Sequence, residues 1–268
     1  MSEPEFSIER DGAVAIVTLS KPHVGNALSS SGARDLGDVF DGWAADNDGV
    51  RAVLIRAEGR QFCTGADLSN SQNEPRTDQR PVNGHMVRQQ RATHHRLIAS
   101  VFHCPLPTIA AVQGAALGFG LHLALATDFV LAAERASFAE PFSARGFSVD
   151  SGGSWLLPRL VGLTRSKKLL YLGDRIDAAT AAAWGLIAEV VGDGELDKIS
   201  RERAQQLAKG PTQALAATKR LLHDGTAGTL EQALHAESMA VELTLRSSDF
   251  KEGMKALATK RPPEFTGT

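Results

Sequence analysis

Apolar residues in the N-terminal three quarters of the chain follow strand and helix spacings in turn. Short apolar runs predict strands over Phe6–Arg10, Val14–Leu19, Val50–Ala57, Thr108–Val112 and Asp128–Ala132. Apolar residues at helical spacing predict helices over Ser29–Ala45, Gly84–His103 and Gly118–Ala126. Strands that alternate with helices are typical of a largely parallel α/β sheet.

After about Leu196 the strand pattern stops and only helical segments follow. These segments are Asp197–Ala208, Thr212–His223, Leu230–Leu245 and Asp249–Lys260. We therefore expect an α/β core over residues 1–196 and a helical region over residues 197–268 that caps the core or joins subunits. The polar, proline-interrupted segment Ser69–Asn83 predicts a mobile loop.

Composition narrows the class of protein. The 268 residues are 43% hydrophobic and 22% charged, which fits a folded globular chain. The formal net charge of -2 gives no overall positive field for a nucleic-acid backbone. Only Cys63 and Cys104 are present, which excludes a disulfide scaffold and a four-cysteine zinc site. With no apolar run long enough to span a bilayer, the sequence predicts a cytoplasmic protein without a membrane or nucleic-acid partner.

Two glycine-bearing turns each follow a buried strand. They are Phe62–Asp67 and Gly114–Gly120. Small residues let backbone N–H groups face outward, and the second turn opens a helix whose N-terminus adds partial positive charge. Brought together, two such turns would hold a carbonyl oxygen that gains negative charge, as an oxyanion hole does. For either turn alone, the alternative is that the glycines only make the turn.

Five segments along the chain resemble the crotonase superfamily, the enoyl-CoA hydratases and isomerases. They are Phe62–Leu68, Pro107–Gly120, Leu157–Gly162, Ala182–Ile187 and Asp249–Gly253, within a resemblance that runs from about Phe6 to Thr266. The resemblance implies a spiral of ββα units and a C-terminal α-helical region that builds homotrimers or dimers of trimers. It also implies an acyl-CoA thioester as the substrate, with neither a prosthetic group nor a metal.

The same resemblance assigns the backbone donors and the coenzyme A contacts. The oxyanion hole would consist of the N–H groups of Ala66 and Phe119. The residues matched to coenzyme A binding are His23, Val24, Thr64, Gly65, Leu68 and Lys260. In the family, the lysine that Lys260 matches commonly reaches the adenine end from a neighbouring subunit.

The reaction depends on positions at which this chain departs from the family pattern. Hydratases of the family use two glutamates, and the matching positions hold His122 and Phe142. Asp150 lies where several family isomerases carry a catalytic aspartate, and one carboxylate can remove and return a proton. The alternative is that Asp150 caps the helix that begins near Ser151.

Apolar neighbours and other titratable groups enlarge this set of candidates. Burial among Phe147, Val149 and Trp155 would make the carboxylate of Asp150 a better proton acceptor. His122 follows the second turn by one helical turn and is a candidate hydrogen-bonding group, base or packed residue. Glu140 is a possible substitute glutamate, provided that a strand continues through Pro141.

We conclude from the sequence that the chain stabilises a thioester enolate and isomerises an enoyl-CoA double bond, with Asp150 as acid and base. Hydration of an enoyl-CoA is the first alternative. His95 and Asp150 match the base and nucleophile of halobenzoyl-CoA dehalogenases, although His94 and His95 on a polar helix are typically solvated. A non-catalytic relative and a nicotinamide enzyme are further alternatives, but Gly118–Leu123 lacks the third glycine of the dinucleotide motif.

Overall fold

The computed structural model describes residues 3–67 and 83–268. The strands are β1 (Phe6–Asp11), β2 (Val14–Leu19), β3 (Ala52–Ala57), β4 (Thr108–Val112), β5 (Ala115–Leu117), β6 (Phe129–Ala133), β7 (Ser137–Ala139), β8 (Ile176–Asp177) and β9 (Glu189–Val191). The helices are α1 (Ser30–Ala45), α3 (His85–Ala92), α4 (His94–His103), α5 (Phe119–Leu125), α6 (Gly153–Lys167), α7 (Ala178–Trp184), α8 (Leu196–Ala208), α9 (Thr212–Gly225), α10 (Leu230–Thr244) and α11 (Ser248–Thr259). Shorter helical turns are η1 (Pro22–Val24), η2 (Ser143–Arg145) and η3 (Lys168–Leu172).

Within these residues the strands form two sheets. The larger sheet has the order β1-β2-β3-β4-β6-β9, and only its β1–β2 pair is antiparallel. The smaller sheet has the order β5-β7-β8. Because β4 continues almost directly into β5, the second glycine turn lies where the chain passes from one sheet to the other.

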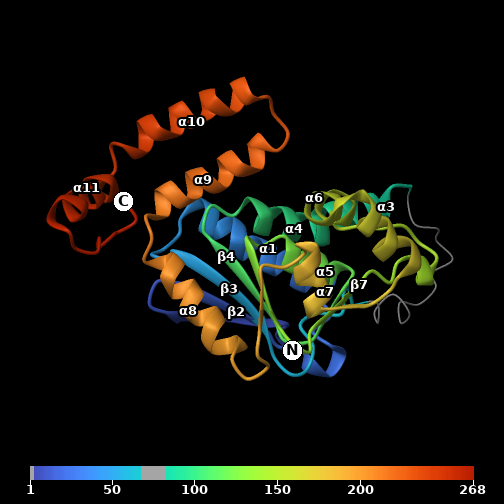
Figure 1. Ribbon diagram of the computed structural model, residues 1–268. Coiled ribbons are helices and arrows are strands. Elements are labelled where there is room, and N and C mark those ends of the chain that lie inside the picture. The colour runs from blue at the N-terminus through green and yellow to red at the C-terminus, as the bar shows by residue number, and fades with distance from the viewer. Residues whose placement is uncertain (1–2, 68–82) are drawn as a thin grey trace.

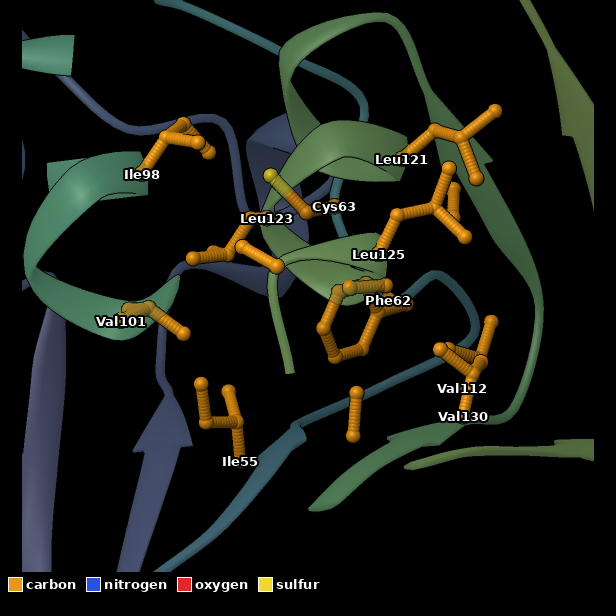
Figure 2. Packing of buried hydrophobic residues seen from close by; sticks show 14 of the residues in the cluster. Ile55, Phe62, Cys63, Ile98, Val101, Val112, Leu121, Leu123, Leu125 and Val130 are labelled. Carbon is orange, nitrogen blue, oxygen red and sulfur yellow. The ribbon is translucent and has the colours of Figure 1, made fainter. Parts of the chain in front are cut away.

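Both faces of the larger sheet are covered. Alternate residues of β2 pack on opposite sides, with Val17 in the cluster under α1, α4 and α5 and Ile16 in the cluster under α8. Figure 1 shows α8 lying across β2, β3 and β4. Figure 2 shows Leu125 of α5 next to Phe62, with Leu121 and Leu123 on the same helix. The helix that opens at the second turn is therefore held by the core.

The structure confirms the α/β class, the alternation of strands and helices, and the helical C-terminal region. One predicted element is wrong: the helix expected over Gly84–His103 is two helices, broken at Thr93, where φ is -133° and ψ is -103°. The Thr93 hydroxyl donates to the Gln89 carbonyl, an alternative to regular helix bonding. The loop predicted over Ser69–Asn83 lies outside the described residues except for its last residue.

The C-terminal arm consists of α9, α10 and α11 with the tail to Thr268. In Figure 1 it projects from the body of the molecule, and α10 lies beside α9. Helix α10 contains no buried residue. Arg51 ties the base of the arm to the sheet, because its guanidinium donates to Thr212 Oγ1 at 2.9 Å, to the Phe265 carbonyl at 2.9 Å and to the Gly210 carbonyl at 2.6 Å. In the described part of the chain, no helix is both long and apolar enough to cross a membrane.

Candidate active site

The two glycine turns pack against each other through their backbones. The Leu117 N–H donates to the Cys63 carbonyl at 3.0 Å, and the Cys63 N–H donates to the Ala115 carbonyl at 3.2 Å. A Cβ at Gly120 would lie 2.2 Å from the Cys63 carbonyl oxygen, so no side chain fits there. The structure thus joins two turns through residues that are 52 and 54 positions apart in the sequence.

Each turn carries one of the expected backbone donors. Ala66 forms a parallel bridge with Leu28, whose bonds use the Gly65 carbonyl and the Asp67 N–H, so the Ala66 N–H points to the other side. Phe119 is the first residue of α5, and a helix leaves its first N–H groups without internal partners. Neither N–H has an acceptor among the residues that the structure describes. That both bind one substrate oxygen stays a prediction.

Asp150 lies in the loop before α6 and is partly buried. Its Oδ1 accepts from the Ser151 hydroxyl at 2.8 Å, and its Oδ2 accepts a long hydrogen bond from Gln90 Nε2 at 3.4 Å. The alternative that its side chain caps the helix is wrong: the Gly153 N–H donates to the backbone carbonyl of Asp150, and α6 has no side-chain cap. The described contacts of the carboxylate are therefore those with Ser151 and Gln90, and not with the N-terminus of α6.

The expected apolar enclosure of Asp150 is only partly present. Phe147 and Trp155 keep 47% and 40% of their surfaces exposed. Trp155 packs on Phe102 and under the guanidinium of Arg159, on the side of α6 that faces α9. Trp155 is thus in contact with Phe102 of α4 and Arg159 of α6, and that it also shields the carboxylate stays a prediction.

His94 and His95 are both partly buried, which corrects the expectation that they are solvated. His94 Nε2 lies 3.2 Å from the Leu28 carbonyl, and its ring meets Phe119 edge-on at 4.7 Å between centroids. Burial lowers the pKa of His94, which favours the neutral ring. His95 Nε2 accepts from the Ser151 N–H at 3.3 Å. The helix breaks at Thr93, directly before these two histidines. His94 contacts Leu28 and Phe119, whereas His95 contacts Ser151.

His122 and Glu140 form a buried pair that sequence reasoning missed. His122 Nε2 lies 2.9 Å from Glu140 Oε1, and both side chains are fully buried. Burial raises the pKa of Glu140, although the contact with His122 opposes this shift. Strand β7 ends at Ala139, as Pro141 suggested, yet the glutamate turns inward to the helix. The ring of His122 also stacks on Phe142, with centroids 5.8 Å apart.

Four of the residues matched to coenzyme A binding lie together. The η1 turn carries His23 and Val24, which are both exposed. The Gly25 carbonyl that follows accepts from the Thr64 N–H at 3.0 Å, so η1 lies against the turn that contains Gly65.

The other two matched residues do not join this group. Leu68 lies outside the described residues. Lys260 ends α11, which Figure 1 shows in the arm, away from α5. Within one chain, therefore, Lys260 is separated from the rest of the predicted coenzyme A site.

A cavity of about 490 Å³ lies elsewhere, between α4, α6 and α9. Its lining is mainly apolar and includes Trp155, Leu160 and Leu222, but neither Asp150 nor the two turns. We therefore define the candidate active site by the two turns and the titratable residues described above, and not by this cavity.

Comparison with known proteins shows the family and the fold. The family model described as enoyl-CoA hydratase/isomerase matches residues 9–268. The "Probable enoyl-CoA hydratase" of Rhodobacter capsulatus is 37% identical over 267 residues, which cover 100% of both chains. The 1,2-epoxyphenylacetyl-CoA isomerase of Escherichia coli is 36% identical and the match covers 95% of each chain. The crystal structure of an enoyl-CoA hydratase from Bacillus anthracis superposes with a TM-score of 0.90 at 30% identity, over 98% of this chain and 100% of that one.

The chain therefore belongs to the enoyl-CoA hydratase/isomerase family, in the crotonase superfamily. It is an enzyme of the lyase or isomerase type, and its fold is that of the crotonase structures. The resemblance seen in the sequence is confirmed. Because the relatives include named hydratases, an isomerase and the carnitinyl-CoA dehydratase of Shigella flexneri, the family alone leaves the reaction open.

Proposed function

We propose that this enzyme moves the double bond of an enoyl-CoA thioester, with Asp150 as the single acid and base. The observation that carries the proposal is the state of that carboxylate: it accepts bonds from Ser151 and Gln90 but caps no helix. The position of the second hydratase glutamate holds Phe142, which is buried and cannot activate water.

The proposed reaction has two proton transfers. The Asp150 carboxylate removes a proton from a carbon of the acyl chain, and the electron pair moves into the thioester as an enolate. The Ala66 and Phe119 N–H groups bind the enolate oxygen, and each such donor contributes about 3 to 4 kcal/mol in comparable sites. Protonated Asp150 then returns the proton to another carbon of the same conjugated system, so the double bond shifts and no atom is gained or lost.

His122 completes the proposed set of catalytic residues, with its ring held by Glu140. His122 lies about one helical turn after Phe119, on a helix whose residues are all buried. The hydrogen bond to Glu140 fixes the orientation of the ring. Hydration remains the second candidate, because this chain keeps one glutamate near the site and its relatives include named hydratases. His95 fits a dehalogenase base less well, since Nε2 already accepts from the Ser151 N–H.

The proposed coenzyme A site includes His23, Val24, Thr64 and Gly65 from one chain, and Leu68, which follows the first turn in the sequence. Lys260 would come from a neighbouring subunit. The separation of α11 from the site and the bare apolar face of α10 support a homotrimer or a dimer of trimers. In this proposal residues 1–196 contain the active site and residues 197–268 join the subunits. The enzyme works in the cytoplasm.

The test is Asp150→Asn assayed with enoyl-, dienoyl- and aryl-acetyl-CoA esters in water enriched in heavy oxygen. We expect wild-type product without incorporated label, and a loss of turnover of at least 100-fold in the variant with nearly unchanged ester binding. Asp174→Asn, at an exposed position, is the matched control. Full activity of Asp150→Asn would refute the assignment, and label in the product would favour hydration.

A further inference from the structure

Ser151 has a backbone conformation that serine rarely adopts. Its φ is +48°, in the left-handed region, and only 2% of its surface is exposed. A Cβ makes this region unfavourable, and glycine would occupy it without that cost. Gly152, the next residue, also has a positive φ of +84°. A strained serine beside a proposed catalytic residue points to a role for its side chain.

The side chain of Ser151 contacts the proposed proton carrier directly. Its hydroxyl donates to Asp150 Oδ1 at 2.8 Å, an ordinary distance for a hydroxyl hydrogen bond. The bond from Gln90 to the other oxygen, Oδ2, is longer, at 3.4 Å. The two carboxylate oxygens are therefore unequal: Oδ1 is firmly held and Oδ2 is the freer one.

The backbone of Ser151 is fixed from a different element. Its N–H donates to His95 Nε2 at 3.3 Å, and His95 lies on α4. Gln90 lies on α3, just before the break at Thr93. The turn that carries Asp150 is thus attached to both helices on either side of this break. None of these contacts is needed to start α6, whose N-terminal residue Gly153 bonds to the Asp150 carbonyl instead.

We propose that Ser151 is a positioning residue: its hydroxyl binds Oδ1 of Asp150 so that Oδ2 faces the substrate and exchanges the proton. His95 anchors the Ser151 backbone, and Gln90 is a weaker tether for the carboxylate. The proposal rests on the proposed role of Asp150 and deepens it. The proton moves from the substrate carbon to Oδ2 and from Oδ2 to the second carbon, while the Ser151 hydroxyl keeps its own proton throughout.

The test distinguishes the effect of losing the Ser151 hydroxyl from the effect of relieving its backbone strain. Ser151→Ala removes the hydroxyl and keeps the strain, whereas Ser151→Gly removes both. We expect both variants to lower kcat by about 10- to 100-fold with KM changed less than about twofold. The Tm of Ser151→Gly should equal that of the wild type or exceed it by about 2 to 4 °C. Ser154→Ala, which removes an exposed hydroxyl in the first turn of α6, is the control and should change neither quantity.

A double-mutant cycle shows whether Ser151 acts through Asp150. In an Asp150→Asn background, Ser151→Ala should cause no further loss of kcat, because the carboxylate that it positions is already gone. A full additional loss would overturn the proposal. Wild-type kcat in both Ser151 variants, with Asp150→Asn inactive, would overturn it and leave the proposed function standing. If Asp150→Asn is fully active, the proposed function and this inference fail together.

Discussion

The turns of the active site and the C-terminal arm are stabilised in opposite ways. The turns are joined by backbone groups at close range, with glycine where no Cβ fits and with buried side chains around them. The arm is joined to the body mainly through one arginine and the contacts of α9, and α10 buries nothing. The first region is complete within one chain, whereas the second presents apolar surface that a second chain can cover.

Part of the exposed apolar surface of α10 lies along one side of the helix. Leu230, Leu234 and Val241 are separated by four and seven residues, which places them on one face. Their exposed fractions are 69%, 53% and 53%. An apolar face of this kind is typical of an interaction site. We therefore predict that mutations in the turns reduce catalysis, and that mutations on α10 reduce association between subunits.

The largest effect should come from Gly120→Ala. The new methyl group would meet the Cys63 carbonyl at 2.2 Å and force the two turns apart. We expect a loss of about 2 to 4 kcal/mol in unfolding free energy and at least a 100-fold loss of turnover. Urea unfolding and steady-state kinetics measure these two quantities.

Gly225→Ala is the matched control in the arm. Its Cβ would have nothing within 4 Å, so the stability should stay the same or rise slightly. Equal damage from both substitutions would contradict the contrast between a tight turn and an open arm.

A charge on the face of α10 should abolish association without unfolding the subunit. Leu234→Glu places a carboxylate in the expected interface, where it loses the leucine contact of about 2 kcal/mol or more and adds a desolvation cost. Light scattering coupled to size exclusion should show a smaller species, with far-ultraviolet circular dichroism unchanged. Ile8→Glu on β1, at another exposed apolar position, should keep the wild-type mass.

Removing the attachment of the arm should have a smaller and local effect. Arg51→Met loses three hydrogen bonds to Thr212, Gly210 and Phe265, which we estimate at about 2 to 3 kcal/mol of local stability. Hydrogen exchange should rise in α9 and α11 and stay constant in β2 and β3. Arg10→Met removes only a surface pair with Asp48 and serves as the control. Uniform exchange throughout the chain would show that the arm is not a separate unit.

The smallest effect concerns pH. Burial lowers the pKa of His94 in the folded state, so the unfolded chain binds a proton first when the pH falls below about 6.5. Stability due to this group is present above pH 6.5 and decreases on acidification. His94→Gln should reduce that decrease by about 1 kcal/mol or less, as measured by urea unfolding at pH 7.5 and 5.5. An unchanged pH dependence would show that other groups, such as His223, account for it.

The spacing of apolar residues predicted the main strands and helices, but not the position at which a helix breaks. The predicted strands agree with the structure to within about two residues, since both faces of the main sheet are buried and give continuous apolar runs. Thr93 gives no strong signal for a break, because a threonine can make the same local bond to the carbonyl four residues earlier inside a continuous helix. The strand of three residues at Ala115–Leu117 is too short to show a period.

Part of the candidate site was visible in the sequence through motif and family pattern. The turns around Ala66 and Phe119 were identified in this way, and the structure brings the turns together. The pair of His122 and Glu140 was not identified, since it depends on an inward turn of one side chain after β7 ends. The Ser151 hydroxyl was not identified either, because nothing in a single sequence reveals a left-handed φ at a serine.

In the proposed site, the two donors at Ala66 and Phe119 are backbone groups, which leaves the side chains at these positions free to change. A substitution there can alter the shape of the acyl pocket while the N–H groups remain in the chain. In this arrangement the backbone N–H of each residue stabilises the intermediate, and its side chain shapes the pocket that selects the substrate. Such an enzyme can acquire a new substrate by changing a side chain and still keep the means of stabilising its intermediate.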